Sequence, residues 1–152
     1  MKIGDKLPNL TLESTGEQQV NLAKIKKQNI IIYFYPRDST PGCTTEGQNF
    51  RDLIEQFNQH NTIIFGVSRD SIKSHEKFKQ KQEFPFELIS DPDEALCKAF
   101  DVIKLKKLYG KEYLGIERST FLFNSKGKLT NEWRKVRVKG HVETVLEAVE
   151  QL

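Results

Sequence analysis

One cysteine, Cys43, lies in an unusual local sequence, YPRDSTPGCTTEGQ (residues 35–48), in which a Pro-Gly step precedes the thiol. Apolar residues then recur at helical spacing from Phe50 to Phe57, which predicts an amphipathic helix that begins near Cys43. A cysteine reacts as its thiolate, and the free N–H groups of a helix N-terminus stabilise that negative charge. Thr40, three residues earlier, has a hydroxyl able to donate to the sulfur or to a substrate oxygen. The pattern favours a nucleophilic thiol over the alternative, a small apolar residue that fills the first turn of a helix.

The second cysteine, Cys97, lies in the segment DEALCKAF (residues 93–100). In a helix, Leu96 and Phe100 belong to the apolar stripe, and we expect Cys97 to lie beside that stripe. None of its sequence neighbours would activate it. Two interpretations stay open: an unreactive core residue, or a second thiol that pairs with Cys43. Because a disulfide requires Cα atoms within about 7 Å, we expect such pairing to require local unwinding of both helices.

The order of the remaining patterns predicts the elements that position these cysteines. Buried strands are expected at 30–35, 62–68 and 86–89, with helices from near Cys43, over 71–82 and over 93–100. Two further strands, 119–124 and 128–136, precede a closing helix at about 141–152, and short alternating runs predict an N-terminal hairpin. Residues 104–115 form the least regular segment. This alternation predicts an α/β protein that resembles the thioredoxin class, with an N-terminal β-hairpin extension.

Length and composition restrict the function classes. The 152 residues are 37% hydrophobic and 30% charged, with a net charge of +3, so we expect a single domain over 1–152 and no strong attraction to polyanions. The longest apolar run is too short to cross a bilayer, and the N-terminal residues lack the apolar core of a signal peptide. We therefore expect a soluble, cytoplasmic protein without a membrane partner. Two cysteines do not make a disulfide framework, so we expect both to be reduced at rest.

The motif around Cys43 resembles the peroxiredoxin family. Pro36, Thr40 and Cys43 have the family's spacing, and YPRDSTPGCTTE resembles the peroxiredoxin Q or bacterioferritin comigratory protein subfamily. The segments GDKLPNLTL, FGVSRDS, ISDPDEALCKAFDV, GIERSTFLFNSKGKL and VKGHVETVL extend this resemblance over nearly the whole chain. The resemblance implies a thiol-dependent peroxidase in which Cys43 is the peroxidatic cysteine, Thr40 and Pro36 shape its pocket, and Arg118 contacts the thiolate. It also implies that Glu46 belongs to the supporting polar network, and that no metal or organic cofactor takes part.

The chain departs from the subfamily at the position of the resolving cysteine. Many members carry this cysteine five residues after the peroxidatic one, and Gln48 occupies that position here. After reaction with peroxide, a sulfenic acid at Cys43 must condense with another thiol before excess peroxide oxidises it further. Cys97 is one candidate. The others are external thiols, namely glutathione, glutaredoxin or thioredoxin.

Other functions have weaker support from the sequence. A thioredoxin-like disulfide reductase would need a cysteine three residues before Cys43, where Thr40 stands. A non-enzymatic module that senses oxidant through Cys43 and passes a disulfide to a partner remains the alternative to a peroxidase. The three histidines lack metal-site spacing, and the lysines near residues 104–111 are more typical of a solvated loop than of a nucleic-acid site. The resemblance favours a monomer.

Overall fold

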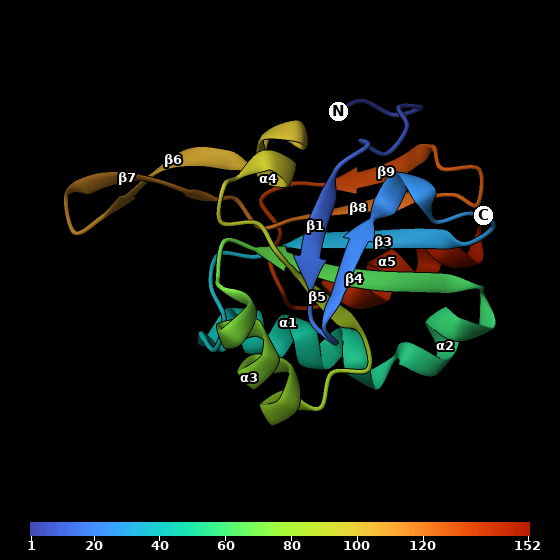
Figure 1. The fold of residues 1–152 in the computed structure, drawn as a ribbon, viewed down its shortest axis with the longest axis horizontal. Helices are drawn as coiled ribbons and strands as arrows, with labels where there is room; N and C mark the ends of the chain where they lie inside the picture. Colours follow the sequence, from blue (N-terminus) through green and yellow to red (C-terminus); the bar gives the residue numbers. More distant parts are fainter.

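The computed structural model describes all residues, 1–152, and has a seven-stranded mixed sheet at its centre (Figure 1). Its strands, in the order in which they lie side by side, are β2 (Gln18–Asn21), β1 (Thr11–Ser14), β5 (Glu87–Ser90), β4 (Thr62–Ser68), β3 (Asn29–Phe34), β8 (Ser119–Phe123) and β9 (Leu129–Trp133). The three middle strands β5, β4 and β3 are parallel, and the outer strands pair antiparallel. The predicted α/β architecture is confirmed.

Strand β3 separates two apolar cores because its successive side chains point to opposite faces of the sheet. Ile30, Ile32 and Phe34 belong to one core, which also contains Leu96 and Cys97. The other core, on the opposite face, contains Ile31 and Tyr33 of β3 and Tyr35, which follows the strand. It also contains Cys43 and Phe50. Both faces of the sheet are therefore buried, as the uninterrupted apolar run of this strand predicts.

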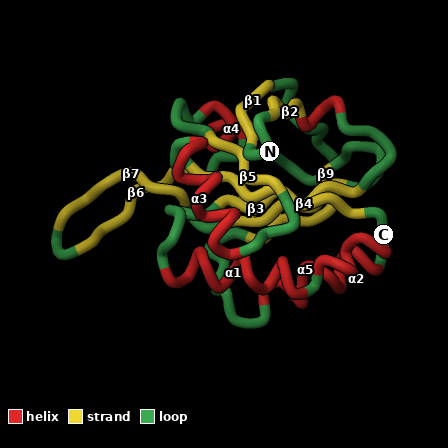
Figure 2. The backbone as a smooth tube through the Cα atoms, turned by 60° about the horizontal axis from the view of Figure 1, so that its bottom comes forward, coloured by secondary structure: helices red, strands yellow, loops and turns green.

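The helices are divided unequally between the two faces (Figures 1 and 2). Four of them contribute side chains to the core that contains Cys43: α1 (Pro41–Asp52), α2 (Ile54–Gln59), α3 (Ile72–Gln82) and α5 (His141–Glu150). The short helix α4 (Ala95–Ala99) and the 3-10 turn η1 (Leu22–Lys24) contribute to the other core. No helix combines the length and apolar character needed to cross a bilayer.

Two hairpins flank this framework. The N-terminal hairpin β1–β2 is present as expected, and β1 also pairs with β5, so the hairpin extends the main sheet. The expectation of an irregular segment at 104–115 was wrong: β6 (Ile103–Leu108) and β7 (Lys111–Ile116) form a separate hairpin that projects from the body (Figure 2). Tyr109 and Gly110 both have positive φ, as in the tight turns that join such strands. The sequence pattern did not predict these strands because most of their side chains are exposed and show no alternating burial.

Candidate active site at Cys43

The thiol of Cys43 lies in the first turn of α1, the helix that follows β3 in the chain. Thr40 is the N-cap residue in an extended conformation, and Pro41 occupies the first helical position, where its missing N–H costs nothing. The carbonyl of Thr40 accepts the first helical bond, from Thr44 N at 2.9 Å. Cys43 is only 2% exposed. The local sequence therefore fixes where the helix begins, and with it the position of the sulfur.

Arg118 reaches this sulfur because of the register between β3 and β8. Phe34 at the end of β3 pairs with Ser119 at the start of antiparallel β8, so Arg118 lies beside the loop that leads into α1. Its Nη2 donates to Cys43 Sγ at 3.4 Å, and its side chain is 16% exposed. A Cβ at position 42 would lie 3.1 Å from this Nη2, so Gly42 provides the space in which the guanidinium approaches.

Glu46, one helical turn after Cys43, is fully buried and holds the other end of the guanidinium. Arg118 Nη1 donates to Glu46 Oε1 at 2.7 Å, while Glu46 Oε2 has no hydrogen-bond partner. Burial raises the pKa of Glu46 to about 7, and Arg118 opposes that increase. The 2.7 Å bond is compatible with both protonation states, because the carbonyl oxygen of a neutral carboxyl group also accepts. Arg118 thus lies between a buried carboxyl group and the thiol.

The hydroxyl of Thr40 does not donate to the sulfur, as its position in the sequence suggested it could. It donates to the carbonyl of Arg37 at 2.8 Å rather than to the sulfur. Its proton is therefore engaged by the backbone, and Oγ1 keeps lone pairs that can accept a hydrogen bond. Pro36 lies two residues beyond the end of β3 and is half-buried, at the start of the loop that leads to Thr40.

Two further ionisable side chains lie close enough to Arg118 to be affected by its charge. His141, at the start of the last helix, is buried, and its Nε2 shares a 2.8 Å hydrogen bond with Thr120 Oγ1. Burial, followed by the charge of Arg118, lowers the pKa of His141 to about 4. Lys106 of β6 is half-buried, and burial together with Arg118 lowers its pKa. Lys106 belongs to the lysine-rich segment that the sequence indicates as a solvated loop, and only the fold brings it and His141 close to Arg118.

Cys97 occupies the core on the other face of the sheet. It is completely buried and lies within the apolar stripe rather than beside it, so that expectation was wrong. Its backbone N–H donates to Asp91 Oδ2 at 2.7 Å. Burial and then the charge of Asp91 raise the pKa of this thiol far above its ordinary value. The two thiols are free, and the structure does not bring them together.

This arrangement, a thiol at the start of the helix that follows a central parallel strand, with an arginine beside the sulfur, defines the class of thioredoxin-like thiol peroxidases. The AhpC/TSA family model matches residues 3–132. The chain belongs to this family.

Relatives and solved structures agree with that assignment. The chain is 54% identical over 141 residues to the peroxiredoxin Bcp of Xanthomonas campestris pv. campestris, covering 93% of this chain and 88% of the relative. It is 49% identical over 152 residues to the peroxiredoxin Bcp of Bacillus subtilis, covering 100% and 97%. A structure of the X. campestris bacterioferritin comigratory protein, studied for its alkyl peroxide reduction activity, matches with a TM-score of 0.92 at 50% identity, over 99% of this chain and 98% of that one.

These similarities confirm the thioredoxin-like fold and the resemblance to peroxiredoxin Q. The protein is a thiol-dependent peroxidase, and the alternative of a non-enzymatic redox-sensing module is not favoured.

Proposed function

We propose that Cys43 is the peroxidatic thiol and that hydrogen peroxide and small organic hydroperoxides, including alkyl peroxides, are the substrates. The observation that carries this proposal is the contact of Arg118 Nη2 with Cys43 Sγ at 3.4 Å, with the same guanidinium held by buried Glu46. A fixed, always-charged donor beside a sulfur at a helix N-terminus stabilises the thiolate, which is the reactive form.

The peroxide step is a nucleophilic displacement on oxygen. The thiolate sulfur attacks the oxygen of ROOH that carries the hydrogen, the S–O bond forms while the O–O bond breaks, and RO⁻ leaves and takes up a proton to give ROH. Negative charge moves from sulfur to the two oxygens, so donors aimed at that region lower the barrier. The product at Cys43 is a sulfenic acid.

Each neighbouring residue has a distinct role in this proposal. Arg118 stabilises both the thiolate and the charge that develops on the peroxide oxygens. Thr40 Oγ1, whose proton is used by the Arg37 carbonyl, accepts a hydrogen bond from the hydroperoxide O–H and orients it. Pro36 shapes the loop wall of the pocket, and Glu46 orients the arginine.

Regeneration requires a thiol from outside the chain. The sulfenic acid condenses with R′SH to give a mixed disulfide and water, and a second thiol attacks that disulfide to release Cys43. Cys97 is a poor candidate because it lies in the other core, and burial together with Asp91 keeps it protonated. Gln48 donates to Gln82 Oε1 at 2.9 Å and contributes no sulfur. Thioredoxin, glutaredoxin and glutathione are the candidate reductants.

The remaining parts of the proposal concern the setting of the reaction. We assign the whole chain, 1–152, to one thioredoxin-like domain that works as a monomer in the cytoplasm. Neither a metal nor an organic cofactor is needed in the proposed chemistry, since sulfur and peroxide supply and accept the two electrons.

A pair of serine variants tests the proposal. Peroxide consumption is measured for Cys43→Ser and Cys97→Ser, with thioredoxin, glutaredoxin and glutathione supplied in turn. We expect Cys43→Ser to fold and to consume no peroxide above the uncatalysed rate, whereas Cys97→Ser keeps nearly full turnover with at least one external reductant. Retained turnover in Cys43→Ser would remove Cys43 from the mechanism. Loss of turnover in folded Cys97→Ser would make Cys97 the resolving thiol.

A further inference from the structure

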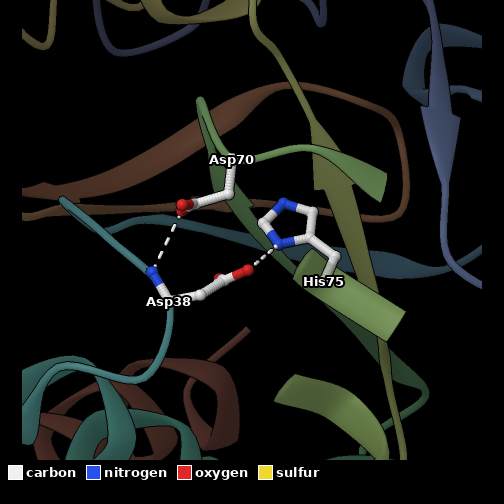
Figure 3. Close-up of side chains that lie close together, drawn as sticks. All are labelled: Asp38, Asp70 and His75. Carbon is white, nitrogen blue, oxygen red and sulfur yellow. Dashed lines mark hydrogen bonds and ion pairs between the residues drawn. The ribbon is translucent and has the colours of Figure 1, made fainter. Parts of the chain in front are cut away.

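The loop that leads to Cys43 is anchored by a buried pair of ionisable residues, Asp38 and His75 (Figure 3). His75 extends from α3, and its Nδ1 lies 2.7 Å from Asp38 Oδ2. The side chain of His75 is completely inaccessible and that of Asp38 is 3% exposed. The loop before the candidate active site is thus held by a side chain from a helix more than thirty residues away in sequence.

The hydrogen bonds around this pair are nearly complete. The Asp38 carboxylate accepts from Tyr35 Oη at 2.7 Å and from Ser74 Oγ at 2.8 Å, in addition to the bond with His75. His75 Nε2 lies 3.0 Å from the carbonyl oxygen of Ile89 in β5. Both ring nitrogens of His75 are thus engaged, Nδ1 by the Asp38 carboxyl group and Nε2 by a backbone carbonyl.

A metal ion is a poor alternative occupant of this cluster. Asp38, Asp70 and His75 place one potential ligand atom each within 4.8 Å of one another. However, Asp70 Oδ2 already accepts from the backbone N–H of Asp38 at 3.0 Å and from Ser68 Oγ. His75 Nδ1 is hydrogen-bonded to the Asp38 carboxyl group, and both groups would have to bind the same cation. The polar atoms that face one another in this cluster already form hydrogen bonds. The cluster therefore anchors the loop through hydrogen bonds.

The anchored segment has a strained backbone. Ser39, directly after Asp38, has φ of +61°, a left-handed conformation that non-glycine residues rarely adopt. Such a conformation persists only where the surroundings fix it. On one side of Ser39, the contacts of Asp38 hold the chain to Tyr35 just after β3, to α3 and to the loop after β4. On the other side, Thr40 is the N-cap residue of α1. The anchor therefore determines how the first turn of α1, with Cys43, enters the site.

We propose that Asp38 and His75 are positioning residues for the peroxide step, which hold the loop at 36–40 so that Thr40 and Cys43 keep the geometry that the reaction needs. This inference rests on the proposed role of Cys43 as the peroxidatic thiol. Neither residue touches the sulfur. They act through the loop, and a 1 Å displacement of a reacting group costs roughly 100-fold in rate.

The proposal requires two reactions of the same thiol to change in different ways. Reaction with peroxide depends on the assembled pocket, because charge on the leaving oxygen must be stabilised. Alkylation by iodoacetamide needs a thiolate that the reagent can reach, and Cys43 is only 2% exposed in the assembled loop. Loosening the loop should therefore slow the first reaction and spare or accelerate the second. Buried Cys97 serves as an internal reporter, because it becomes reactive only if the fold itself loosens.

The test compares His75→Asn and Asp38→Asn with a matched histidine control, His60→Asn, whose parent side chain is exposed. Stopped-flow mixing gives the rate of oxidation by hydrogen peroxide, and mass spectrometry gives the alkylation rate of each cysteine. We expect oxidation of both anchor variants to be roughly 10- to 100-fold slower. Alkylation of Cys43 should be equal or faster and Cys97 should stay unlabelled, while His60→Asn behaves as wild type.

Oxidation at the wild-type rate in folded anchor variants would overturn the proposal, as would a slower oxidation matched by an equal fall in alkylation. If the anchor variants fail to fold, or if Cys97 becomes labelled, Ser74→Ala decides. It removes one of the donors to Asp38 and leaves His75 in place. A few-fold slower oxidation of that variant supports the anchor, and an unchanged rate contradicts it. Wild-type protein oxidised elsewhere than at Cys43 would instead contradict the underlying function.

Discussion

Cys43 and Cys97 are almost equally hidden from solvent, at 2% and 0% exposure, but the charges around them are opposite. Cys43 lies 3.4 Å from the guanidinium of Arg118, which separates it from the buried carboxyl group of Glu46. Cys97 has a buried acidic neighbour, Asp91, which accepts a hydrogen bond from the backbone N–H of Cys97. At Cys97, burial and then Asp91 disfavour the thiolate, and the opposing effect of Arg69 is smaller. Only Cys43 has a guanidinium within hydrogen-bond distance of its sulfur.

In the proposed mechanism, the position of a cation decides which of the two buried thiols reacts with peroxide. Both cysteines are carried by helices that pack on the same sheet, and each has an acidic residue nearby. The arginine is positioned by strand register, because pairing of Phe34 with Ser119 brings the start of β8 to the helix that bears Cys43. The Arg69 guanidinium on the side of Cys97 pairs with Glu94 at 3.0 Å instead of with sulfur.

Removing the arginine from the first site should have the largest effect. We expect Arg118→Ala to slow the oxidation of Cys43 by about 10²- to 10³-fold, the range for loss of one preorganised donor to developing oxyanion charge. The measurement is stopped-flow oxidation by hydrogen peroxide. Arg69→Ala is the matched control, and it should oxidise at the wild-type rate. If the two alanine variants oxidise equally fast, the cation at Cys43 is not what distinguishes the two thiols.

The carboxyl group of Glu46, which binds Arg118, should affect the free energy of unfolding in a defined pH range. Burial raises the pKa of Glu46 from its ordinary 4.5 to about 7. Between these values the folded protein retains a proton that the unfolded chain has released, so the free energy of unfolding falls as pH rises through the window. The expected loss is about 3 kcal/mol for this group.

Glu46→Gln should lack this component. Relative to wild type, the free energy of unfolding of the variant should increase by about 3 kcal/mol between about pH 4 and pH 8. Urea unfolding at several pH values measures the difference, and groups that are common to both proteins cancel. Parallel stability profiles for the two proteins would show that Glu46 titrates at its ordinary value. That result would make the arginine-carboxylate pair ionic over most of this pH range.

The smallest effect on catalysis is expected at the second thiol. Cys97→Ala should leave peroxide turnover with an external thiol unchanged, while loss of the buried sulfur should lower the free energy of unfolding by about 1–2 kcal/mol. Denaturant unfolding and a coupled peroxidase assay give the two quantities. A folded variant with normal stability and lost turnover would reverse the assignment, because Cys97 would then act in the reaction and not in packing.

Much of the site could be predicted from local sequence. The Pro-Gly step fixed the start of α1, so the position of Cys43 in its first turn followed from short-range rules. The apolar runs predicted β3 and β4 to within one residue at each end. Arg118 was found through the family motif, because nothing in local periodicity predicts which strand start lies beside a helix 75 residues earlier.

The remaining features depend on tertiary contacts. His75 fits the face of α3 that includes Phe78, but its partner Asp38 lies in a loop that only the fold brings to it. The helical pattern predicted Cys97 beside the apolar stripe, and its complete burial results from the packing of α4 over the sheet. The β6–β7 hairpin pairs with itself away from the core, so its strands carry no burial pattern.

The most direct test of this division between the two thiols is the site of the first oxidation. Reduced protein is treated with one equivalent of hydrogen peroxide, trapped with a sulfenic acid reagent and analysed by intact and peptide mass, before and after addition of glutathione. We expect one added oxygen, on Cys43, which glutathione converts to a mixed disulfide while Cys97 stays a free thiol. Oxidation at Cys97, or a quantitative loss of two hydrogens as a Cys43–Cys97 disulfide, would contradict it.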